Sequence, residues 1–226
     1  MTYVAPAPEA PLAATEPPRD CPLCPRLVAF REACRAEHPG WWNAPVPAWG
    51  DPAARIAIIG LAPGKHGANR TGRPFTGDYA GDLLFSTLLR FDLAEGDYGA
   101  DPADSLRLTG AIVINAVKCL PPANKPTPAE IATCRRYLTE QADGLAHARV
   151  FVALGRIAHD SFLKSQGARL AAHPFGHGAE HRLADGRTLI DSYHCSRYNT
   201  NTGRLTEAMF AAVFARARQL ADDLPA

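Results

Sequence analysis

One loop in the first third of the chain has the composition of a binding site for an anionic ligand. Residues 60–78 read GLAPGKHGANRTGRPFTGD and follow the apolar run IAII. Glycines permit tight turns and a close approach of the backbone to a ligand, basic side chains supply positive charge, and Phe75 offers a flat apolar face. The glycines and basic residues are Gly60, Gly64, Gly67, Gly72, Gly77, Lys65, Arg70 and Arg73. This composition indicates a ligand that carries both phosphate and a planar ring.

The segment is not a phosphate-binding P-loop. That motif needs Gly-x4-Gly-Lys followed by serine or threonine, whereas three residues separate Gly60 from Gly64 and His66 follows Lys65. The chain therefore offers no hydroxyl for magnesium at this point. A glycine-rich segment can also be a long surface connection after a strand, so this interpretation needs support from the rest of the chain.

The cysteines provide the first support, because four of the six have a spacing that suits a metal centre. Cys21 and Cys24 form a Cys-x2-Cys pair, and Cys119 and Cys134, separated by fourteen residues, complete a set of four soft ligands. The N-terminal residues lack the basic and apolar regions of a signal peptide, so we expect a reducing cytoplasm. There, such a pair binds metal more often than it forms a disulfide.

The cysteine spacing leaves several alternatives open. Four thiolates suit zinc as well as an iron–sulfur cluster. Cys34, ten residues after Cys24, is another candidate ligand, and several of the cysteines could be small buried apolar residues.

A histidine motif near the C-terminus provides further support. Residues 191–199 read DSYHCSRYN and follow the apolar run RTLI. That run is typical of a buried strand, which places His194 at the strand's carboxyl end. Ligands of open α/β sheets bind at this edge.

The pattern of the whole chain predicts an α/β fold with a parallel sheet covered by helices on both faces. Apolar runs predict strands at 55–60, 111–117, 149–154 and 188–193, and longer periodic stretches predict helices at about 81–90, 128–145, 156–164 and 206–221. Thr127 followed by Pro128 and Glu130 is a good helix start, which would place Cys134 on a helix. We expect a disordered tail at 1–18 and a single domain at 19–226.

Net charge neither favours nor excludes nucleic acid, because the chain of 226 residues has a formal charge of only +1. Basic residues do gather in or beside the loops expected at the carboxyl edge of the sheet: Lys65, Arg70, Arg73, Lys118, Lys125, Arg197 and Arg204. They could form a cationic rim or be ordinary solvated charges. The chain has no eighteen-residue apolar run, so we expect no membrane span.

Three segments together resemble the signatures of the family 5 uracil-DNA glycosylases, a branch of the uracil-DNA glycosylase superfamily. They are residues 60–78, residues 115–128 (NAVKCLPPANKPTP), and His194 to Asn199 followed by TGRL at 202–205. Their order and approximate spacing also match. With the cysteines, the resemblance covers about residues 20–222.

The resemblance implies a three-layer α/β/α sandwich around a four-stranded parallel sheet. It also implies a structural [4Fe–4S] cluster held by Cys21, Cys24, Cys119 and Cys134, which would leave Cys34 and Cys195 as spare thiols. The implied reaction is hydrolysis of the N-glycosidic bond of uracil in DNA, with hypoxanthine and xanthine as further substrates, in base excision repair. The enzyme would act as a monofunctional glycosylase and as a monomer on DNA in the cytoplasm, in the nucleoid, after flipping the base out of the duplex.

The resemblance also implies roles for individual residues. In catalysis, His194 would hydrogen-bond the departing base and Asn124 would occupy a polar position characteristic of family 5. Phe75 would stack on the base and Asn115 would bind its edge, beside Gly60, Ala62, Gly64 and Asn199. DNA would contact Lys65, His66, Arg70, Arg73, Arg197, Tyr198 and Arg204, with Arg197 and Tyr198 as candidates for the wedge that replaces the flipped nucleotide.

Two positions depart from the wider superfamily. Leu61 and Ala62 stand where other branches have an acidic or amide residue, so either a carboxylate elsewhere orients the attacking water or the sugar cation, once formed, captures water with little help. Asp78 is the nearest carboxylate of the motif, and we expect it to do this, unless it only caps the helix expected near Gly81. Cys195 follows the histidine where proline is commoner.

Two other functions fit parts of the sequence. One is a DNA-binding protein of the same fold without catalysis. The other is a hydrolase of free nucleotides that uses the loop 60–78 for phosphate.

Overall fold

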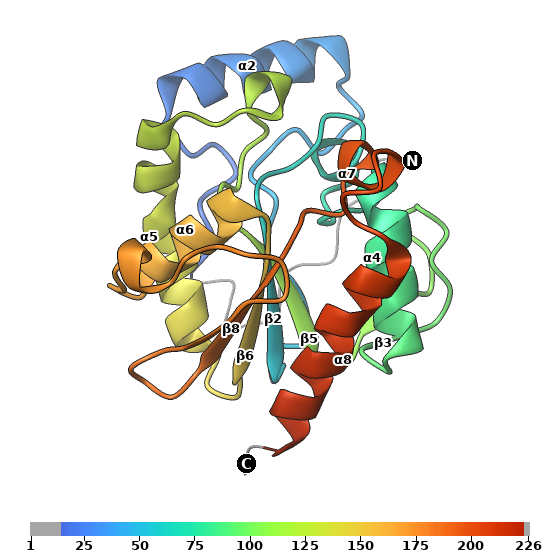
Figure 1. Ribbon diagram of the computed structural model, residues 1–226. Coiled ribbons are helices and arrows are strands. Elements are labelled where there is room, and N and C mark those ends of the chain that lie inside the picture. The colour runs from blue at the N-terminus through green and yellow to red at the C-terminus, as the bar shows by residue number, and fades with distance from the viewer. Residues whose placement is uncertain (1–14, 224–226) are drawn as a thin grey trace.

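Four parallel strands form the centre of the protein. In the computed structural model, which describes residues 15–223, these strands are β2 (Ile56–Gly60), β5 (Ala111–Asn115), β6 (Val150–Leu154) and β8 (Thr188–Ser192), in the order β5-β2-β6-β8. Every residue in them is buried, as expected for a sheet covered on both faces. The four-stranded parallel sheet predicted from the apolar runs is confirmed (Figure 1).

Short antiparallel strands extend this sheet at both edges. Strand β1 (Trp49–Gly50) pairs with β5, and β7 (Glu180–Arg182) pairs with β8, which makes a mixed sheet of six strands. Strands β3 (Ala94–Glu95) and β4 (Arg107–Leu108) form a separate two-stranded sheet. The sequence did not predict any of these strands, because two or three residues are too few to show a period.

Helices cover the two faces of the sheet. Helices α4 (Tyr79–Arg90) and α8 (Glu207–Asp223) lie on one face, and α5 (Pro128–Gly144) and α6 (Arg156–Ser165) lie on the other (Figure 1). Side chains of β2 alternate between two apolar clusters: Ile58 belongs to one with Phe85 and Phe214. Ile59 belongs to the other with Phe162. This arrangement confirms the expected three layers.

Helix α5 begins where the sequence predicts. The Thr127 hydroxyl accepts a hydrogen bond from the Glu130 amide, and the Glu130 carboxylate accepts one from the Thr127 amide, which together form a capping box. Glu130 also binds the Arg26 guanidinium at 2.7 and 2.8 Å. Arg26 lies on α2 (Pro25–Glu37), a helix that the sequence did not predict, and this pair joins α2 to α5.

Smaller helices occur in the loops that carry the motifs. They are α3 (Ala68–Thr71), α7 (Arg197–Asn201) and the 3₁₀ turns at Pro122–Asn124 and Leu170–Ala172. Most of the tail expected at 1–18 lies outside the described residues. Its last part is packed on the domain, because the Glu16 carboxylate accepts hydrogen bonds from the Ala48 amide at 2.6 Å and the Gln141 side chain at 2.5 Å. Between residues 15 and 223, no helix has the length and apolar character needed to cross a membrane.

Candidate active site

A cavity of about 390 Å³ opens at the carboxyl edge of the parallel sheet. The loops that follow β2, β5 and β8 meet there, as expected for strands that run in the same direction. Nine residues that the sequence singled out line this cavity: Leu61, Ala62, Gly64, Phe75, Asp78, Asn115, Asn124, His194 and Arg197. The three motifs are therefore brought together in space.

Phe75 and His194 form an aromatic pair in the cavity. Their ring centroids lie 6.0 Å apart and their planes differ by 23°. Phe75 has a φ of +60°, a backbone conformation that is uncommon for a residue with a side chain. The ring is buried against the apolar cluster around Phe85, so its direction is fixed by packing.

Asn115 ends β5 directly opposite Gly60 in β2. Its side chain is buried, and within residues 15–223 its Oδ1 has no hydrogen-bond partner. A Cβ atom at Gly60 would lie 2.4 Å from this oxygen and 3.0 Å from the Phe75 ring, so only glycine leaves room for both. An unpaired buried acceptor costs about 1–3 kcal/mol, which a ligand with an N–H donor would offset.

His194 follows β8 and presents a second polar atom without a partner. Its Nδ1 is buried and has no hydrogen-bond partner within the described chain. Burial lowers the pKa of His194 to about 4. The imidazole is therefore neutral at neutral pH, with one nitrogen that donates and one that accepts.

Asp78 occupies the N-cap position of α4, but its side chain makes no capping hydrogen bond to that helix. The carboxylate instead lies against the loop, where a Cβ at Gly64 or Gly67 would come within 2.6 or 2.0 Å of it. Burial raises the pKa of Asp78, and a hydrogen bond from the Ala68 amide opposes that rise. Asp78 thus brings a partly buried carboxylate to the cavity wall.

Asn199 and Cys195 lie beside the cavity rather than in its lining. The Asn199 side-chain amide donates to the His194 carbonyl at 2.8 Å, which closes the turn after the histidine. Asn199 lines an adjoining cavity of about 290 Å³ together with Arg204. Burial raises the pKa of Cys195 to about 12, so this thiol stays protonated.

The candidate wedge residues begin helix α7, and Arg197 lines the cavity. The Arg197 guanidinium lies 5.0 Å from the centroid of the Tyr79 ring, and the Tyr198 side chain is 71% exposed. Tyr79 also lines the cavity, and its hydroxyl accepts a hydrogen bond from Thr200 of α7 at 3.2 Å. Tyr79 was not among the predicted site residues, although it comes immediately after the loop motif.

The other basic residues expected to contact DNA are in different environments. Arg70 is exposed and donates to the His66 carbonyl at 2.7 Å. The Lys65 ammonium pairs with Glu37 at 2.8 Å. The edge of the His66 ring contacts Trp41, with ring centroids 5.5 Å apart.

Arg73 differs from these residues because it is buried. Its guanidinium forms two hydrogen bonds with the Asp104 carboxylate, at 2.7 and 2.8 Å, and lies 4.8 Å from the centroid of the Trp49 ring. The expectation that Arg73 contacts DNA is therefore corrected: its charge is already paired, and it fixes the loop to the segment around Asp104.

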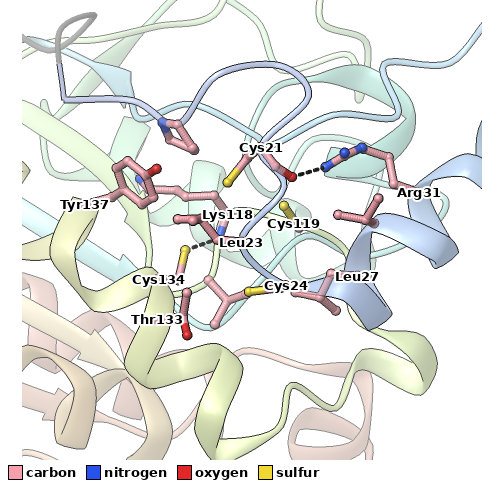
Figure 2. A pocket seen from close by; sticks show the side chains of 13 residues that line it. Cys21, Leu23, Cys24, Leu27, Arg31, Lys118, Cys119, Thr133, Cys134 and Tyr137 are labelled. Atoms are coloured by element: carbon pink, nitrogen blue, oxygen red, sulfur yellow. Dashed lines mark hydrogen bonds between the residues drawn. The ribbon is translucent and has the colours of Figure 1, made fainter.

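The four predicted metal ligands line one small pocket near α2. Figure 2 shows the sulfurs of Cys21, Cys24, Cys119 and Cys134 around it. Burial and the neighbouring thiols raise the pKa of Cys24 to about 11, and burial and Cys134 raise that of Cys119 to about 12. Four thiols that oppose one another's ionisation are a suitable donor set for a positively charged centre. The fifth candidate, Cys34, does not line this pocket.

In the described residues, no three of these cysteine sulfurs lie within 4.8 Å of one another. Four Zn–S bonds of about 2.3 Å would bring the sulfurs to about 3.8 Å from one another. In the described part of the chain, ligand atoms of three residues lie within 4.8 Å of one another only at His159, His181 and Asp191.

Comparisons with known proteins agree with this geometry. The model of the family "Uracil DNA glycosylase superfamily" matches residues 47–218. The chain is 50% identical over 208 residues to the type-5 uracil-DNA glycosylase of Thermus thermophilus, covering 89% of this chain and 94% of that protein. It is 43% identical to the type-5 enzyme of Mycobacterium tuberculosis (89% and 78% covered) and 42% identical to that of Pyrobaculum aerophilum (88% and 88% covered).

Proposed function

The chain belongs to the uracil-DNA glycosylase superfamily, whose enzymes hydrolyse N-glycosyl bonds, and we propose that it removes uracil, and also hypoxanthine and xanthine, from DNA in base excision repair. One observation carries the proposal. Asn115 and His194 line the same cavity as Phe75, and each has a buried polar atom without a partner in the described chain, Oδ1 and Nδ1 respectively. A flipped base supplies both a flat face and the polar edge that these atoms lack.

Each of these residues has a role in the proposed base release. The base stacks on Phe75, and Asn115 Oδ1 accepts a hydrogen bond from a ring N–H. As the C–N bond breaks, its electron pair stays on the base, and neutral His194 donates a hydrogen bond to the oxygen where negative charge develops. The Asp78 carboxylate accepts a proton from the water whose oxygen bonds to the sugar.

The apolar loop favours the wider substrate range. Leu61 and Ala62 line the cavity and carry no polar side chain that would reject a purine. Asn124, also in the lining, lies in a turn with a φ of +55°. We assign it to the part of the base edge that differs between substrates.

DNA binding is assigned to the exposed rim of the cavity. Arg197 and Tyr198 on α7 fill the space left by the flipped nucleotide, and Lys65, His66, Arg70 and Arg204 face the phosphates. The protein would do this as a monomer, in the cytoplasm.

We further propose that Cys21, Cys24, Cys119 and Cys134 hold a [4Fe–4S] cluster. When bound, the cluster joins three segments by metal–thiolate bonds and takes no part in base release. The residues around it are suited to thiolates, because the Lys118 amide donates to the Cys134 sulfur at 3.3 Å. The buried Arg31 guanidinium, bonded to the Cys21 carbonyl at 3.2 Å, adds positive charge.

The function is tested by incubating the purified protein with duplexes that carry one uracil, hypoxanthine, xanthine or mispaired thymine, and measuring abasic sites. We expect release of uracil first. Binding to the uracil duplex without base release would favour the non-catalytic alternative. Hydrolysis of nucleoside phosphates, but not of DNA, would favour the nucleotide hydrolase.

The cluster leads to a prediction about metal content. The wild-type protein should contain iron and acid-labile sulfide, and Cys119→Ser should lose both and much of its solubility. Cys34→Ser is the matched control, because Cys34 is a buried cysteine outside the pocket, and it should keep the iron. Stoichiometric zinc in protein purified without oxygen would contradict the assignment.

Recognition of the base leads to a second prediction. Phe75→Ala should weaken the binding of every substrate base by about 1–3 kcal/mol, because stacking does not depend on the identity of the base. Asn115→Ala and Asn124→Ala should instead change the ratio of rates among uracil, hypoxanthine and xanthine. Unchanged substrate ratios in both asparagine variants would refute the assignment of the base edge to these residues.

A further inference from the structure

A buried cluster of one carboxylate and two imidazoles lies near the carboxyl end of β8. Asp191 in β8 hydrogen-bonds His159 of α6 through Oδ1 at 2.7 Å, and His181 of β7 through Oδ2 at 3.1 Å. The exposed fractions are 0% for Asp191, 1% for His159 and 9% for His181. None of these residues lines the base cavity, so the proposed function gives them no role.

The distances favour hydrogen bonds over a metal ion. Tetrahedral ligands with bonds of about 2.0 Å lie about 3.3 Å apart. The 2.7 Å contact between His159 Nδ1 and Asp191 Oδ1 is shorter than this and typical of a charge-assisted hydrogen bond.

His159 has an oxygen atom beside each of its ring nitrogens. Its Nδ1 faces the Asp191 carboxylate, and its Nε2 faces the His173 carbonyl at 2.9 Å. Both partners accept hydrogen bonds, whereas a neutral imidazole has only one N–H. An imidazolium at His159 beside an ionised Asp191 satisfies both contacts and pairs two opposite charges.

Other titratable groups near this pair are few. Asp160 Oδ1 lies 3.9 Å from His159 Nε2 and is partly exposed. His181 donates to the second Asp191 oxygen, and the edge of its ring contacts His173, with centroids 5.5 Å apart. Phe175 covers the His159 ring at 5.5 Å.

The same aspartate fixes the backbone that leads to the active site. Its Oδ2 accepts from the Gly176 amide at 3.2 Å, its carbonyl accepts from the Gly178 amide at 2.8 Å, and its amide donates to the Ala179 carbonyl at 2.9 Å. The Tyr193 amide donates to His177 at 3.1 Å in the same segment. Residues 176–179 and the end of β8 are thus joined as one unit around Asp191.

His194 comes three residues after Asp191. Its Nδ1 has no hydrogen-bond partner within the described residues, so no bond at that atom orients the ring. The direction of the ring depends on Phe75 and on the backbone that Asp191 holds.

We propose that the ion pair of Asp191 and His159 positions His194 for base release. Both are positioning residues, because they act through His194 and touch no substrate. The inference rests on the proposed function, in which His194 stabilises the departing base.

The test compares Asp191→Asn in two backgrounds. In the wild-type background we expect the single-turnover rate on saturating uracil duplex to fall by about 10- to 100-fold, since a displacement of about 1 Å has effects of this size. The affinity for the duplex should not change. In the His194→Ala background the same change should have no further effect on the rate. Asp160→Asn, the same substitution at the partly exposed neighbour of His159, should keep the wild-type rate.

A second measurement is independent of activity. Nitrogen NMR should show both ring nitrogens of His159 protonated in the wild type and only one in Asp191→Asn. If Asp191→Asn does not fold, His159→Gln, which keeps hydrogen-bonding groups without the charge, takes its place in the rate comparison.

Three results would overturn the proposal. An equal loss of rate in both backgrounds would mean that the pair is only structural. One equivalent of zinc bound by the wild type and lost in His181→Ala would mean a metal site. A neutral His159 in the wild type would remove the ion pair. Failure of the wild type to release any base would instead refute the proposed function, and the NMR result would still decide the state of His159.

Discussion

Replacing His194 by alanine is expected to slow release of uracil by about 10²- to 10³-fold, the usual effect of removing one donor to a developing negative charge. The ring lies in the cavity beside Phe75, and its Nδ1 has no competing partner in the described chain. The donor stabilises the departing base more than the bound substrate, so the loss should fall on the single-turnover rate and not on the affinity for DNA.

The pH dependence provides a check on the same residue. Burial lowers the pKa of His194 to about 4, so the imidazole stays neutral throughout the neutral range. We therefore expect no ionisation of His194 in the rate profile near neutral pH. A rate step near the ordinary histidine pKa that disappears in His194→Ala would contradict a neutral donor.

The lowered pKa of His194 should also make the protein less stable as the pH falls. A histidine with a lowered pKa binds fewer protons in the folded than in the unfolded state between the two pKa values. Its contribution to stability is therefore fully present above the unfolded pKa and is lost as the pH falls toward about 4. His194→Ala should lose less stability than the wild type over that range, as measured by denaturant unfolding.

The parallel sheet and the meeting of the three motifs could be predicted from the sequence. Each central strand is an apolar run buried on both faces, and the carboxyl ends of parallel strands share one edge. Once Gly60, Asn115 and His194 are placed at strand ends, they have to lie close together. The start of α5 was also predictable, because its cap is local in sequence.

Side chains whose partners are distant in sequence were not predictable. Arg73 resembles a DNA contact until Asp104, in a separate loop, is found to pair with its guanidinium. Asn199 belongs to the histidine motif, yet its amide binds the backbone of that motif. Asp191, His159 and His181 come from three elements, and no short pattern reports their contact.

Asp78→Asn is expected to slow base release strongly without lowering the stability of the protein. General-base assistance is typically worth about 10²- to 10⁴-fold, so single-turnover base release should slow by that factor with DNA affinity nearly intact. Asp82→Asn, in the first turn of the same helix and outside the cavity lining, is the matched control and should keep the wild-type rate.

The raised pKa of Asp78 decides the direction of the effect on stability. Burial raises that pKa, which means that the folded state holds the proton more tightly than the unfolded state does. At neutral pH the ionised carboxylate therefore lowers the free energy of unfolding. An asparagine of the same shape carries no charge and removes this penalty. Asp78→Asn should unfold at the same or a higher denaturant concentration than the wild type. A partly buried carboxylate that lowers the stability of the fold, beside Gly64 and Gly67, is typical of a residue required for chemistry. A variant that cleaves at the wild-type rate would show that water attacks without this carboxylate, and His194 and nearby amides would then have to supply all of the catalysis.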